Sequence, residues 1–343
     1  MKNRESNIEL LRIIAIMMVL MLHFNLVGWH PDVLSCSEAF SWTSLEGKLI
    51  EAFCIAAVNV FVMISGYFAI KLSLKSVLNL YIRCFIIGIV SYLAYILIVG
   101  EPISISAIGG RVLAFTDNHW WFVISYIGLM AISPILNAGC EALSKRLYVY
   151  VLALLSVVML YFGWYKNLEV TNGGYSLIHF VYLYIIARYI KLHVREQIIK
   201  EYRFVWLTLF FLMVVLVVAM AYIEPMRAYA YNSPIIIIEA ISLLLFFVSI
   251  PFYNKFINWI ALSVFSAYLI QSSPYFGQMW LYPKVNELFM NGCCISDSIL
   301  FATLVISTLI ISIAIDKVLV MPVIKILFSY LQRKDSNIIH YDS

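Results

Sequence analysis

The chain of 343 residues is 63% hydrophobic and 12% charged, with a mean hydropathy of +0.93. An average soluble domain has roughly 45–50% apolar and 25% charged residues, so a water-soluble fold is excluded. The net charge of +4 comes from basic residues scattered over short loops, which argues against a nucleic-acid partner. Six cysteines without a Cys-x-x-Cys or Cys/His spacing predict neither a metal site nor a dense disulfide framework.

Apolar runs of spanning length recur along the whole chain. A transmembrane helix needs about 20 apolar residues, so the length allows about ten helices and no sizeable soluble domain. We predict an all-α, polytopic transmembrane bundle that forms a single membrane-embedded domain over residues 1–343. The first run contains Arg12 and His23 and lacks a clear cleavage site, which favours a retained helix over a signal peptide. The ten predicted spans cover residues 8–28, 52–70, 77–99, 119–137, 149–165, 175–190, 204–223, 234–250, 257–280 and 299–320.

The basic residues predict the orientation of the bundle. Placing the N-terminus in the cytoplasm puts seventeen of the 23 Lys and Arg residues in inside segments and five in outside segments. Arg12 lies within the first span. Such an asymmetry favours an even number of spans with both termini cytoplasmic.

Ionisable residues inside spans are costly, so each is a functional candidate. Arg12 and His23 are eleven residues apart in the first span. Eleven residues turn a helix about 20° past three full turns, which puts both side chains on one face about 16 Å apart. A snorkelling Arg12 and a His23 that only hydrogen-bonds to a neighbouring helix are the alternative interpretations.

Depth along the helices sorts the remaining candidates into two layers. A histidine near a buried carboxylate suits general-base chemistry on a hydroxyl, and arginines at the opposite end suit phosphate groups. For the basic layer, the ordinary excess of cytoplasmic Lys and Arg is an equally good explanation. The predicted outer layer is His23, His119, His179 and Glu239, and the predicted inner layer is Arg12, Arg83, Arg188 and Lys191.

The order of motifs resembles acyltransferase family 3, a family of membrane-bound acyltransferases. Residues 7–12 (NIELLR) followed by His23 are similar to its Arg-x10-His signature. Residues 61–67 (FVMISGY) are similar to its second-helix motif. Residues 119–122 with 133–137 are similar to its fourth-helix block. Residues 173–191 and 259–270 also resemble segments of this family.

The resemblance implies that His23 is the essential histidine and that Arg12 is its partner near the acyl-CoA. Three positions depart from the family pattern. Glu9 replaces the common aspartate, Leu80 stands where a second arginine pairs with Arg83, and Gln271 stands where a histidine often follows the Tyr-Leu-Ile stretch.

The resemblance therefore implies an O-acyltransferase of the bacterial plasma membrane, of the stand-alone type that modifies surface polysaccharides. Acetyl-CoA or another acyl-CoA is the expected donor, and a cell-surface glycan or its lipid-linked precursor is the expected acceptor. His23 acts as general base, and a covalent acyl-His23 relay stays open as a variant. The alternative from another class is a transporter or flippase whose buried His and Glu residues relay protons. The absence of a detectable internal repeat favours the enzyme.

Overall fold

The described chain is built from helices, as predicted. The computed structural model describes residues 5–35, 41–104, 120–290 and 296–339, and these contain no strand. Lipid offers the backbone no hydrogen-bond partners, so helices, which satisfy their own N–H and C=O groups, are the expected elements. In chain order, with η marking π or 3-10 segments, they are α1 (Ser6–Phe24), η1 (Asn25–Trp29), η2 (Pro31–Leu34), α2 (Trp42–Cys54), α3 (Ala57–Tyr67), α4 (Leu74–Val99), α6 (Trp121–Ala142), α7 (Lys145–Ser156), η4 (Val157–Tyr165), η5 (Glu169–Gly174), α8 (Leu177–His193), α9 (Glu196–Glu201), α10 (Arg203–Ala221), α11 (Pro225–Ala228), α12 (Pro234–Val248), α13 (Lys255–Ala261), α14 (Phe265–Gln271), η6 (Pro274–Leu281), α15 (Tyr282–Met290), α16 (Asp297–Ile315), η7 (Asp316–Val320) and α17 (Met321–Ile339).

Seven helices in the described residues are long and apolar enough to cross a membrane. Lys255–Gln271 and Pro274–Met290 pass the same test together but are bent by 63° at their break, and they make eight if they form one span. The seven are Ser6–Trp29, Trp42–Tyr67, Leu74–Val99, Trp121–Ala142, Lys145–Tyr165, Arg203–Ala221 and Asp297–Tyr330.

Two of the ten predicted spans fall on shorter helices, α8 with 17 residues and α12 with 15. At 1.5 Å per residue, 15 residues reach only about 22 Å, less than the roughly 30 Å of a hydrocarbon core. By length, the number of spans is therefore seven to eight. The count of ten and the cytoplasmic placement of both termini stay predictions.

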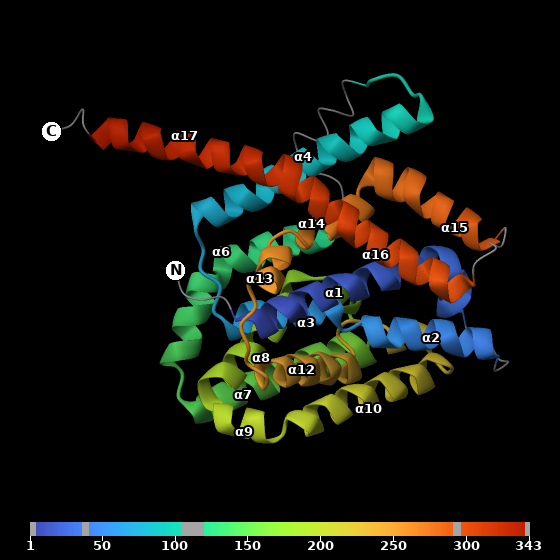
Figure 1. Cartoon of the computed structure of the whole chain (residues 1–343). Coiled ribbons are helices and arrows are strands. Elements are labelled where there is room, and N and C mark those ends of the chain that lie inside the picture. Colours follow the sequence, from blue (N-terminus) through green and yellow to red (C-terminus); the bar gives the residue numbers. More distant parts are fainter. Residues whose placement is uncertain (1–4, 36–40, 105–119, 291–295, 340–343) are drawn as a thin grey trace.

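Helix α1 lies inside the bundle, where it packs against α2, α3, α12, α13, α14 and α16 (Figure 1). Its neighbour α3 approaches α8 closely, because a Cβ on Gly66 would lie only 2.5 Å from the backbone oxygen of Tyr184. Small residues at such crossings let membrane helices pack by van der Waals contact. The contacts of α1 with its neighbours on several sides place the face that carries His23 toward the interior of the bundle.

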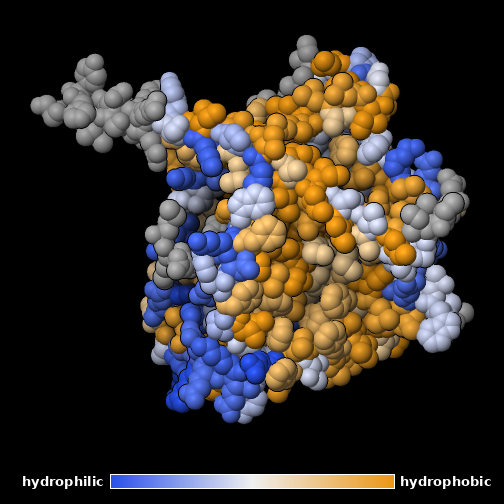
Figure 2. Space-filling model, viewed as in Figure 1, coloured by the Kyte–Doolittle hydropathy of each residue, from blue (hydrophilic) through white to orange (hydrophobic). Residues whose placement is uncertain are grey.

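Apolar side chains cover most of the surface seen in Figure 2, and hydrophilic ones gather along the left edge, on the side of the N-terminus. Large apolar side chains such as Leu97, Phe204 and Ile310 are 85%, 66% and 60% exposed. Water would make such a surface aggregate, whereas lipid tails solvate it. The exposed surface thus fits a membrane protein.

Candidate active site

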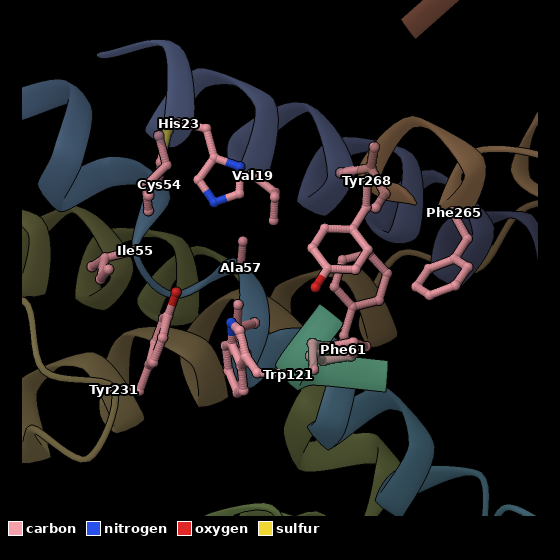
Figure 3. A pocket seen from close by; sticks show the side chains of 14 residues that line it. Val19, His23, Cys54, Ile55, Ala57, Phe61, Trp121, Tyr231, Phe265 and Tyr268 are labelled. Carbon is pink, nitrogen blue, oxygen red and sulfur yellow. The ribbon is translucent and has the colours of Figure 1, made fainter. Parts of the chain in front are cut away.

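His23 faces a cavity in the middle of the bundle, which we call the central cavity. Its empty space, counted together with the space open at its mouth, is about 520 Å³, and its walls come from α1, α2, α3, α6, α14 and the segment before α12. Figure 3 shows the imidazole projecting from α1 into this space, beside Val19 and above Trp121. Tyr231 and Tyr268 supply further polar groups to a lining that is otherwise mainly apolar or aromatic. The imidazole therefore lies in a largely apolar environment.

Two side chains contact the imidazole of His23 at Nδ1. Its Nδ1 lies 2.8 Å from the amide nitrogen of Gln271 and 3.3 Å from the hydroxyl of Tyr282. Gln271 is the last residue of α14, directly before the 63° break, so the bend carries its amide to the imidazole. The other ring nitrogen, Nε2, has no hydrogen-bond partner among the described residues. It is the nitrogen left for a substrate.

The amide of Gln271 can pair with either protonation state of Nδ1. Gln271 is fully buried, and its Oε1 has no described partner while its nitrogen donates to the ring. Turning the amide over lets Nδ1–H of His23 donate to Oε1 and leaves a lone pair on Nε2. The imidazole can therefore present either a donor or a proton acceptor to the central cavity, and Gln271 supports both forms.

A second cavity, the inner cavity, lies between the α3–α4 junction, α4, α6 and α14, and its empty space, counted with the space open at its mouth, is about 710 Å³. Lys71, Ser76, Asn79 and Arg83 contribute its polar groups. Phe265 lines both this cavity and the central one, so one aromatic side chain stands where the two meet. Lys71 is exposed and has no carboxylate partner within the described residues.

Arg83 is anchored by a buried ion pair with Asp316. Its Nη1 also donates to Ser266 Oγ at 3.0 Å, and that hydroxyl donates to the Asp316 carboxylate at 2.6 Å. The three residues connect α4, α14 and η7. A buried charge without a partner is very costly, so this pairing explains how a cation is tolerated at this position.

The other three predicted cations of the inner layer also pair with carboxylates. In the part of the chain that the structure describes, none of them lines the central or the inner cavity. The Arg12 side chain keeps 34% of its surface exposed beside its partner. The pairs are Arg12 with Glu9 at 2.7 Å, Arg188 with Glu141 at 2.8 Å and Lys191 with Glu196 at 2.8 Å.

A third cavity, the outer cavity, has about 1190 Å³ of empty space, counted with the space open at its mouth. It is lined by Glu51, Trp164, Tyr175, Asn232 and further residues of the 163–175 and 224–232 segments. Leu22 and Ile55 line both the outer and the central cavity. The outer and central cavities therefore adjoin at these two apolar side chains.

Of the predicted outer layer, His23 alone lines the central cavity among the described residues. His179 is fully buried, and its Nε2 lies 3.1 Å from Asn59 Oδ1, whose amide nitrogen donates to the backbone oxygen of Tyr231 at 2.9 Å. Glu239 is fully buried, and neither carboxyl oxygen has a described partner. Neither residue lines the central cavity beside His23. His119 lies outside the described residues.

The span Trp42–Tyr67 and the residues that follow it pass the three cavities in order. Glu51 lines the outer cavity, Ile55 the outer and central ones, Phe61 the central one and Lys71 the inner one. A helical rise from Glu51 to Lys71 is at most about 30 Å, close to the thickness of a hydrocarbon core. The cavities thus lie in series along the bundle.

Sequence reasoning missed several residues at these cavities. Gln271 was noted as a departure from the family pattern, but nothing local indicated its contact with His23. Lys71 contributed to the sequence analysis only as one of the basic residues that predict the orientation of the bundle. Asp316 carried a usable signal, because an acid inside the apolar run 299–320 calls for a partner.

Helices of spanning length around an internal cavity with a histidine define a polytopic helical membrane protein. Residues 5–317, nearly the whole chain, match the acyltransferase domain of family 3. The chain therefore belongs to acyltransferase family 3 and is a membrane acyltransferase, which confirms the resemblance predicted from its motifs. No curated relative and no solved structure matches the chain.

The contact between Gln271 and His23 gives a prediction about pH. Replacing Gln271 by Leu keeps the volume but removes the hydrogen bond, and acyl transfer should fall roughly 10-fold or more, a part of what a general base contributes. Gln271→Glu should move the acidic limb of the pH–rate profile to higher pH, because a carboxylate next to Nδ1–H stabilises the imidazolium. Full activity in Gln271→Leu, or an unmoved profile in an active Gln271→Glu, would contradict this role.

Proposed function

We propose that the protein is an O-acyltransferase that moves an acetyl or other short acyl group from acyl-CoA to a hydroxyl of a cell-surface glycan or its lipid-linked precursor. The observation that carries the proposal is the line of three cavities with His23 in the middle one. The donor enters from the cytoplasmic end and the acceptor from the outer end. A bacterial plasma membrane is the proposed location.

The inner cavity suits the phosphate-rich part of acyl-CoA. Lys71 supplies a cation without a described carboxylate partner, and Ser76 and Asn79 supply neutral hydrogen-bonding groups. Arg12, whose Nη1 is held by Glu9, lies one turn before Ile16, which lines the central cavity. Arg12, from the predicted signature, and Arg83, from the third-helix arginine motif, are the proposed contacts with acyl-CoA. Arg188 and Lys191 of α8 do not line the inner cavity and are weaker candidates.

His23 would act through Nε2. This nitrogen takes the proton of the acceptor hydroxyl while the hydroxyl oxygen attacks the thioester carbonyl carbon. The C–S bond breaks, and the proton passes from His23 to the CoA sulfur, so the ring returns to its neutral form. Gln271 Oε1 accepts from Nδ1–H while both ring nitrogens carry protons. A covalent acyl-His23 intermediate is a variant of the same site.

The transporter alternative has less support. It requires buried ionisable groups that connect the two faces, yet His179 and Glu239 do not line the central cavity. Membership of an acyltransferase family favours the enzyme.

Replacing His23 by Ala should reduce acyl transfer by roughly 10²–10⁴-fold, the usual contribution of a general base, without loss of the folded protein. The rate is measured with radiolabelled acetyl-CoA and surface glycan as acceptor. His193→Ala is the matched control, because His193 lies at the end of α8 outside the three cavities. Near-normal turnover by purified His23→Ala would remove His23 from the mechanism.

Replacing Lys71 by Ala should raise the KM for acetyl-CoA roughly 5-fold, the effect of about 1 kcal/mol expected for an exposed ion pair. The effect should vanish with acetyl-pantetheine, which lacks the nucleotide phosphates. Lys75→Ala is the control, since Lys75 follows closely but lies over the Phe328 ring. Equal effects of both substitutions, or an effect retained with acetyl-pantetheine, would refute a phosphate contact at Lys71.

A further inference from the structure

The lining of the outer cavity contains a buried acceptor atom that the described protein leaves without a donor. Asn232 is 1% exposed, and its Oδ1 has no described partner, while its nitrogen makes only a long 3.5 Å contact with Thr171 Oγ1. Leaving a buried acceptor unsatisfied costs about 1–3 kcal/mol, so such an atom beside a cavity indicates a ligand that donates a hydrogen bond.

Glu51 is the second polar group of the outer cavity. It is 3% exposed, and Asn25 fixes its carboxyl group through a 3.0 Å hydrogen bond to Oε2. Asn25 is held in turn by a 3.1 Å bond to the Gly47 carbonyl oxygen. Glu51 is therefore positioned by the protein, and as a lining residue it can receive a further donor from a ligand in the cavity.

The aromatic residues of the outer cavity are fixed as well. The indole N–H of Trp164 donates to the Arg227 carbonyl oxygen at 3.1 Å, and Tyr175 packs against Tyr231 with ring centroids 4.8 Å apart. Gly174, at φ +96°, brings its loop against this wall, where a Cβ would lie 2.8 Å from the backbone nitrogen of Asn232. Rigid aromatic surfaces beside a few fixed polar groups are the usual construction of a small-molecule site.

The charges of the cavity restrict the ligand further. Arg227 is the one cation among its described lining residues, and it pairs with Glu224 at 3.1 Å. A carboxylate ligand would enter beside Glu51 and Glu224 without an unpaired cation to meet it, and its desolvation would go uncompensated.

We propose that the outer cavity is the acceptor subsite and that it holds one uncharged sugar residue, whose hydroxyls donate to Glu51 and Asn232. This inference rests on the proposed acyl transfer, because it places the sugar in the cavity that adjoins the cavity of His23 at Leu22 and Ile55. Aromatic side chains contact the apolar face of the sugar ring. The subsite discriminates against sugars that carry a carboxylate.

Ligand binding can be measured without catalysis. The probes are the methyl glycosides of glucose, galactose and mannose and the corresponding uronates, tested by saturation-transfer NMR with the protein in nanodiscs. At least one neutral glycoside should bind, and its uronate should bind at least 10-fold more weakly. Asn232→Leu and Glu51→Gln should each weaken binding of the neutral sugar roughly 3- to 10-fold, as expected for one hydrogen bond.

Two controls separate this inference from the proposed function. Glu169→Gln makes the same carboxyl-to-amide change in η5, outside the cavity lining, and should leave binding unchanged. His23→Ala should bind the sugar while losing acyl transfer. Uronates that bind as well as neutral sugars, no binding by any of these glycosides, or binding unchanged in both cavity variants would overturn the subsite. Sugar binding without acyl transfer in the wild type would instead count against the proposed function alone.

Discussion

The exclusion of water from the hydrocarbon core is the constraint on which this structure depends. A polar side chain inside the bundle must find a partner in the protein, because lipid supplies none. Arg83 meets Asp316 and Ser266, and His179 meets Asn59, which reaches the Tyr231 backbone. The first group joins α4 to α14 and η7, and the second holds the segment that carries Tyr231 into the central cavity.

Polar atoms without described partners are therefore informative. Nε2 of His23 and Oδ1 of Asn232 both belong to residues that line cavities, where a substrate can complete their hydrogen bonds. Glu239 differs, because its carboxyl group is buried without a described partner and outside the cavity linings. Together with family membership, the cavity-lining atoms connect the fold to acyl transfer, since donor, histidine and acceptor would occupy three adjoining cavities.

Helix positions and the shared face of Arg12 and His23 were predictable, because run length and the 3.6-residue period are local properties. The partners of His23 were not, since Gln271 and Tyr282 lie 248 and 259 positions away and reach it through a bent helix pair. Depth along a helix placed His179 and Glu239 near His23, but depth says nothing about which face points into a cavity. Charge spacing likewise could not show that Arg83 is paired while Lys71 has no carboxylate partner among the described residues.

The central claim is that donor and acceptor use opposite faces of the bundle, and proteoliposomes of known orientation test it most directly. Acetyl-CoA is confined to one side and isolated surface glycan to the other, and transferred radiolabel is counted. The account predicts transfer only when acetyl-CoA is on the face that carries the termini and glycan is on the opposite face, with a flexible pantetheine arm spanning roughly 15 Å to His23. Efficient transfer with both substrates confined to the face that carries the termini would contradict it.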